Sequence, residues 1–195
     1  MGATLFADVE KASLSAYVTV KPDTYSVIGV SVKKPDIDNL PTTNEVVKLA
    51  KARNGSGKLY AYQDVYLYYY FVGENGMSLS VTCSAPLTKE GSDDVIQYSI
   101  SFGSKPTDNW DGGEFKISSS SSSSSSTESV IISSNTAAGY SKTATATTKS
   151  GTSGQKVLAV GIWPITIFTG SIEGMTISSN EKYSGAIYLE ITSNS

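Results

Sequence analysis

The chain has 195 residues, which is enough for one β-domain with a substantial core, and a single domain is the simplest organisation. Serine and threonine make up about a quarter of the residues and only 17% are charged, so the composition favours strands and turns and predicts an all-β protein. The net charge of −3 gives nucleic-acid binding little electrostatic support, and the absence of histidine excludes Ser-His-Asp triads and His-ligated metal sites. We therefore expect no enzymatic activity, no cofactor and no bound metal.

The first predicted strand covers residues 11–20. Its alternate residues are apolar and fall on one face, as a half-buried strand requires: Ala12, Leu14, Ala16, Val18 and Val20. Residues 1–7 resemble the end of a secretory leader, so residues 1–20 are interpreted as a leader remnant followed by a terminal strand. Such a strand can pair with its own sheet or with the sheet of a neighbouring molecule. The second arrangement would make the protein a self-assembling subunit.

A second strand is expected at residues 25–32, and the segment that follows it, residues 43–53, is ambiguous. One interpretation is a helix behind a threonine cap, in which Val46 and Leu49 share a face. The other is a strand, in which Val47 and Leu49 share a face. The pattern leaves this choice open.

Residues 58–72 are rich in tyrosine and β-branched residues and predict one long strand or two bent ones. Alternation places five tyrosines on one face: Tyr60, Tyr62, Tyr66, Tyr68 and Tyr70. Cross-strand packing is the ordinary reason for such a row. The alternative is an aromatic platform for the sugar rings of a surface glycan.

The dipeptide Asn75-Gly76 is a turn signal between two strand patterns and predicts a β-hairpin that joins residues 58–72 to residues 77–83. A further strand is expected at residues 95–102. The single cysteine, Cys83, continues the apolar alternation of its strand. It is therefore interpreted as a small buried hydrophobic residue and not as a reactive thiol.

The C-terminal half begins with a loop-like stretch and a run of nine serines at residues 118–126, which predicts an exposed loop within the domain. Strands are then expected at residues 157–162, 165–169, 175–178 and 186–192. About eight short strands separated by turns are typical of an immunoglobulin-like sandwich, here spanning residues 21–195.

Three stretches carry a resemblance to a known family. They are Val9-Glu10-Lys11 with its alternating strand and Lys21-Pro22-Asp23, then Leu40-Pro41 leading into residues 46–50, and finally Tyr183-Ser184-Gly185 followed by an alternating last strand. In order and approximate spacing the chain resembles the major pilins of the alpha, or class 5, fimbriae of the chaperone–usher pathway, the colonisation-factor and cable pilin type.

The resemblance implies an incomplete immunoglobulin-like sandwich that a donor strand completes. In this family a periplasmic chaperone first fills the groove, and at the outer-membrane usher the N-terminal segment of the next subunit replaces it, a form of β-augmentation. The implied product is an extracellular, cell-surface fimbria, a head-to-tail homopolymer that supports adhesion, including adhesion to host-surface glycans. Two sets of site residues follow. The donor strand would use Val9, Ala12, Leu14, Ala16, Val18 and Val20. The acceptor groove would use Tyr183, Gly185, Ile187, Leu189 and Ile191.

Two other classes of protein remain as alternatives. A carbohydrate-binding or tip-adhesin module would fold without a donor strand and use the tyrosines as its ligand surface. A phage or virion structural subunit would also be an all-β assembly unit.

Overall fold

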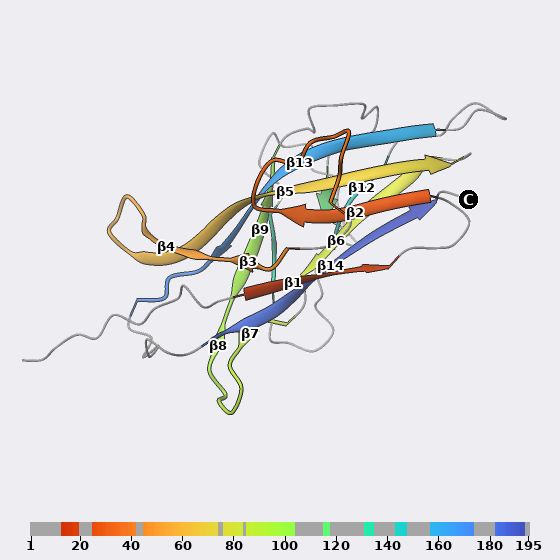
Figure 1. The fold of residues 1–195 in the computed structure, drawn as a ribbon. Helices are drawn as coiled ribbons and strands as arrows, with labels where there is room; N and C mark the ends of the chain where they lie inside the picture. The colour runs from red at the N-terminus through yellow and green to blue at the C-terminus, as the bar shows by residue number, and fades with distance from the viewer. Residues whose placement is uncertain are drawn as a thin grey trace, which may run out of the picture.

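The computed structural model describes residues 13–19, 25–41, 45–73, 76–83, 85–103, 115–117, 131–134, 143–147, 157–173 and 182–193. Within these residues the chain forms fourteen strands in two sheets and no helix (Figure 1). The expected all-β class is therefore confirmed.

Sheet A has eight strands. Its main path runs in the order β10 (Lys116–Ile117), β12 (Thr143–Thr147), β6 (Met77–Cys83), β14 (Ser184–Ser193), β1 (Ser13–Thr19) and β3 (Val47–Lys48). A small hairpin of β7 (Leu87–Thr88) and β8 (Val95–Ile96) joins this sheet through β14.

Sheet B has six strands. Its path runs in the order β11 (Ile131–Ser133), β9 (Tyr98–Phe102), β13 (Val157–Thr169), β5 (Leu59–Gly73) and β2 (Tyr25–Ser31), and β4 (Ala50–Arg53) pairs with the start of β5. Residues 43–53, which the sequence left open, thus contribute strands where they are described. Among the strand pairs of the described chain, β1 and β14 are parallel and the others are antiparallel.

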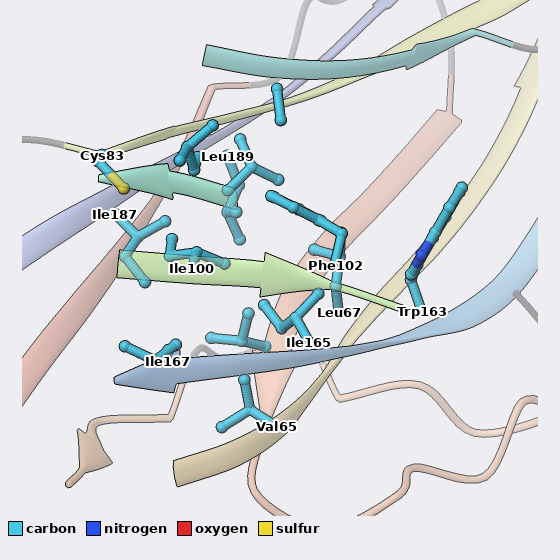
Figure 2. Close-up of a cluster of buried hydrophobic side chains, with 14 of the residues drawn as sticks. Val65, Leu67, Cys83, Ile100, Phe102, Trp163, Ile165, Ile167, Ile187 and Leu189 are labelled. Carbon is cyan, nitrogen blue, oxygen red and sulfur yellow. The ribbon is translucent and has the colours of Figure 1, made fainter. Parts of the chain in front are cut away.

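One hydrophobic core joins the two sheets. Sheet A supplies alternate residues of β6 and β14, including Cys83, Ile187 and Leu189, and sheet B supplies residues such as Val65 and Ile165. Figure 2 shows these side chains converging between the strands. Because the inner faces of both sheets share this core, the arrangement is consistent with a β-sandwich.

The connection at Asn75-Gly76 is not a β-hairpin, contrary to the prediction from the sequence. Strand β5 pairs with β13, β2 and β4 in sheet B, whereas β6 pairs with β12 and β14 in sheet A. The chain therefore crosses from one sheet to the other between Gly73 and Met77. Each of these strands has one apolar face that must be buried. That face can be buried equally well when the two strands lie in facing sheets as when they pair within one sheet.

Strand β13 is continuous through Pro164, where the sequence predicted two separate strands. The carbonyl of Pro164 accepts a hydrogen bond from the N–H of Gly103 at 3.0 Å. An antiparallel pair at this position would return a second bond to the Gly103 carbonyl, but proline has no N–H. The indole Nε1 of Trp163 donates to that carbonyl instead, at 2.8 Å.

The environment of Cys83 confirms the interpretation of this residue as part of the core. Its side chain is buried and makes no disulfide. Burial raises the pKa of its thiol to about 12, and a hydrogen bond with Tyr98 opposes that shift in part. The thiolate is therefore disfavoured at neutral pH.

Several expectations lie outside the described residues. These are the serine run at residues 118–126, the strand expected at residues 175–178, and the ends of the terminal strand at residues 11–12 and 20.

Candidate functional site

The first and last strands of the described residues, β1 and β14, pair with each other. Seven residues of β1 align in parallel with residues 184–190 of β14, and we call this contact the β1 seam. Its register sets Leu14, Ala16 and Val18 opposite Gly185, Ile187 and Leu189. Members of the predicted donor and acceptor sets are thus neighbours within one chain. Of the two arrangements that the sequence allowed, this is pairing of the terminal strand with its own sheet and not with a neighbouring molecule.

The remaining residues of these two sets are distributed as follows. Val9, Ala12 and Val20 lie outside the described residues. Tyr183, immediately before β14, is buried, and Ile191 lies beyond the end of the seam.

Strand β14 is held firmly on its other side. Ile187, Leu189 and Ile191 lie opposite Cys83, Val81 and Leu79 of β6, with exposed fractions of 1%, 1% and 4%. The hydroxyl of Tyr98 crosses from sheet B and donates to the Ala186 carbonyl at 2.8 Å. The acceptor strand is therefore a fixed part of the core.

Strand β1 has much less support on its other edge. Strand β3 pairs only with Ser13 and Leu14, so within the described chain no strand borders residues 15–19 on that side. The main backbone partner of β1 is therefore β14.

The five tyrosines identified in the sequence lie on the outer face of β5, and we call them the tyrosine face. The burial pattern of β5 sends Ala61, Val65, Leu67, Tyr69 and Phe71 into the core, which leaves the alternate residues outside. The rings of Tyr60 and Tyr62 stack with centroids 5.6 Å apart. Tyr62 is 36% exposed, while Tyr60, Tyr66 and Tyr70 are half-buried.

Tyr68 differs from the other members of the tyrosine face because only 1% of it is exposed, although it is not part of the core cluster. Burial, and secondarily the negative charge of Glu45, raise the pKa of its phenol. The carboxylate of Glu45 in turn accepts hydrogen bonds from the N–H of Val32 at 2.8 Å and from the hydroxyl of Ser31 at 3.3 Å. Tyr68 therefore has little surface for contact with a ligand.

A shallow pocket of about 330 Å³ lies beside the tyrosine face. The outward residues that line it come from β5, β13 and the end of β9: Asp64, Tyr66, Ser101, Gly103, Pro164 and Thr166. The hydroxyl of Thr166 donates to Oδ1 of Asp64 at 2.6 Å. We call this the sheet B pocket.

Sequence reasoning found Tyr66 but missed the polar residues of the sheet B pocket. The local signal was Asp64, a carboxylate in the same alternation as the tyrosines. Thr166 and Ser101 join Asp64 only through the pairing of β13 with β5 and β9.

The residues that the structure describes offer neither a metal site nor a membrane-spanning helix. No group of three His, Cys, Asp or Glu side chains there is placed to hold a metal ion. The same residues include no helix long and apolar enough to span a membrane.

Comparison of the chain with models of known families, with curated proteins and with solved structures found no match.

Proposed function

We propose that this protein is the structural subunit of an extracellular fimbria or pilus, and that its copies join by exchanging β1. The observation that carries the proposal is the β1 seam, in which the N-terminal strand is paired over seven residues with the C-terminal strand and with only two residues of β3. The sequence resemblance to chaperone–usher pilins supports the same mechanism.

Exchange of β1 conserves the interactions of the seam. If β1 leaves its own molecule, the N–H and C=O groups on one edge of β14 lose their partners, and the register around Ile187 and Leu189 is left open. The β1 strand of another copy carries the same residues and restores the same pairs. Such swapping is a low-cost route to association between identical chains.

The direction of exchange determines the product. When each molecule gives β1 to one neighbour and receives β1 from another, the interface is heterologous, and it extends into a filament unless the rotation between subunits closes a ring. Under this proposal the fold is an immunoglobulin-like sandwich that is complete only with a β1 strand. A periplasmic chaperone and an outer-membrane usher would hold the open site before assembly. The filament supports adhesion and performs no catalytic step.

The β1 seam offers a direct test by cross-linking. Tyr17 lies opposite Tyr188 in the seam, so the double variant Tyr17→Cys, Tyr188→Cys can form a disulfide between β1 and β14. Native Cys83 is buried with a raised pKa and competes little for oxidation. After oxidation of assembled protein, we expect a ladder of covalent multimers on a non-reducing gel, because each disulfide joins two chains.

A second double-cysteine variant is the control for the disulfide cross-linking. Tyr188 also lies opposite Thr82 of β6, and both belong to the fixed part of sheet A. The variant Thr82→Cys, Tyr188→Cys should therefore give cross-linked monomers in every state of assembly. If the Tyr17 variant also gives only cross-linked monomers, and deletion of residues 1–20 leaves the size distribution on gel filtration unchanged, the exchange mechanism is wrong.

A further inference from the structure

The sheet B pocket has two chemically different sides. One is a polar row across three strands, in which Thr166 lies opposite Asp64 on β5 and opposite Ser101 on β9. The other is an apolar row two residues along the strands, where Tyr66 lies opposite Pro164. Its volume of about 330 Å³ is at the lower end of the range for small-molecule sites, about 300–1000 Å³.

One hydrogen bond in the pocket joins two members of its polar row and leaves capacity for a ligand. Thr166 uses its hydroxyl proton on Oδ1 of Asp64, at 2.6 Å, which orients the carboxylate. An ionised carboxylate accepts about four hydrogen bonds, so Asp64 has acceptor capacity left for hydroxyl groups. The Thr166 oxygen also keeps its lone pairs, and the Ser101 hydroxyl can donate or accept.

We infer that the sheet B pocket binds a neutral sugar ring. A pyranose has a belt of hydroxyl groups and an apolar C–H face, and the pocket presents a row of hydrogen-bonding groups beside a tyrosine ring and a proline. The apolar row receives the C–H face, and Asp64 with Thr166 receives a pair of adjacent hydroxyls.

The charge of the pocket determines which sugars it selects. Asp64 is the charged residue among those lining the pocket, and no lysine or arginine is among them. An acidic sugar, such as a sialic acid, would bring a second negative charge close to this carboxylate, which is unfavourable. A cationic ligand is favoured by several exposed aromatic rings around the charge. The aromatic residues that line this pocket are Tyr66 and Phe102, and Phe102 is only 2% exposed, so Tyr66 offers the one accessible ring.

The inferred site goes beyond the filament role and does not depend on it. The pocket lies on the outer face of sheet B, whereas the β1 seam belongs to sheet A. Exchange of β1 therefore leaves the pocket open, and a filament would repeat it once in each subunit. Repetition of a weak site raises the overall avidity for a surface with many sugars.

The experiment measures sugar binding to the purified full-length chain by saturation-transfer NMR and by titration. The probes are the methyl glycosides of glucose, galactose and mannose, with the methyl glycoside of sialic acid and with methylammonium as competitors. We expect at least one neutral glycoside to bind, and neither competitor to displace it.

Two variants assign the binding to the sheet B pocket. Asp64→Asn keeps the shape of the side chain but removes its charge, and it should weaken binding by about tenfold or more. Tyr66→Ala should abolish saturation transfer to the C–H protons of the ring. The matched control is Asp93→Asn, in the exposed turn between β7 and β8, and it should leave the affinity unchanged.

Three results would overturn the inference. They are the absence of binding by every neutral glycoside, an affinity that is the same in Asp64→Asn and wild type, and displacement of the sugar by methylammonium. Circular dichroism of each variant verifies its fold, and none of these results bears on the cross-linking test of the β1 seam.

Discussion

The indole N–H of Trp163 donates to the carbonyl of Gly103 at 2.8 Å and so takes the place of the N–H that Pro164 lacks. The same indole ring is completely buried and meets Phe115 edge-on, with centroids 4.4 Å apart. Trp163 therefore compensates within one strand for the proline that follows it. This explains how β13 remains a central strand of sheet B across a residue that usually interrupts a ladder.

This compensation predicts a rescue. Trp163→Phe should lower the free energy of unfolding by about 1–3 kcal/mol, because it leaves the Gly103 carbonyl without its donor. Adding Pro164→Ala supplies a backbone N–H at the same carbonyl, so the double variant should be more stable than Trp163→Phe alone. Urea unfolding of the two single variants and the double variant measures the coupling. A double variant no more stable than Trp163→Phe would contradict this account.

Gly161 is required by the tyrosine that lies opposite it in the β5–β13 pair. A Cβ added at Gly161 would stand 2.8 Å from Cζ of Tyr69 and closer still to the hydroxyl. Gly161→Ala should therefore destabilise the fold by about 1–3 kcal/mol, as overpacking of a core does. Tyr69→Phe removes the closest atom and should recover part of that loss in the double variant.

The control for this prediction is Gly170→Ala, since nothing lies within 4 Å of a Cβ at that position. Thermal and urea denaturation should place this variant within about 0.5 kcal/mol of wild type. Equal losses in Gly161→Ala and Gly170→Ala would show that the contact with Tyr69 is not the cause.

The buried thiol predicts a loss of stability in alkaline solution. The pKa of Cys83 is raised from 9.0 to about 12 in the folded state, so above about pH 9 the unfolded chain releases this proton while the folded chain retains it. The free energy of unfolding should therefore fall between about pH 9 and pH 12, by at most about 1.4 kcal/mol per pH unit from this group. Tyr68, whose pKa is also raised, acts in the same direction from about pH 10.

Urea unfolding at a series of alkaline pH values measures this dependence. Cys83→Ala should flatten the decline just above pH 9, and adding Tyr68→Phe should flatten its upper part. An unchanged slope in both variants would mean that other groups govern alkaline unfolding.

Strand exchange also predicts complementation by a peptide. A chain that lacks residues 1–20 leaves the β14 edge of the seam without its partner. A synthetic peptide of residues 9–20 should bind this shortened chain and raise its melting temperature in a saturable way. A peptide with aspartate in place of Leu14, Ala16 and Val18 is the control, and equal shifts from both peptides would argue against occupation of the seam.

The sequence pattern was informative where the signal is local. Alternation placed Leu79, Val81 and Cys83 on a buried face of β6, and it separated the outer tyrosines of β5 from its core residues. Side-chain direction alternates within a strand and so can be deduced from a few neighbouring residues.

The pairing of strands that lie far apart in the sequence could not be predicted from these local patterns. The dipeptide Asn75-Gly76 indicated a hairpin, yet the flanking strands β5 and β6 enter different sheets, because a turn-favouring dipeptide does not specify which strands its neighbours pair with. The sheet B pocket depends on the same kind of pairing. Thr166 and Asp64 are 102 positions apart in the sequence, and no local pattern links them.

The parallel seam between β1 and β14 joins two strands that lie far apart in the sequence. Ser13 pairs with Ser184, so β1 is synthesised well before the strand that it pairs with. Contacts of such high sequence separation form slowly, because the entropy of closing the loop opposes them. During this interval β1 is a free strand and the edge of β14 is an open one. Docking within a molecule proceeds at a rate independent of concentration, whereas capture by another molecule becomes faster as chains crowd together. Under the proposed exchange of β1, the protein concentration during folding would therefore decide how many chains close on themselves and how many join a neighbour.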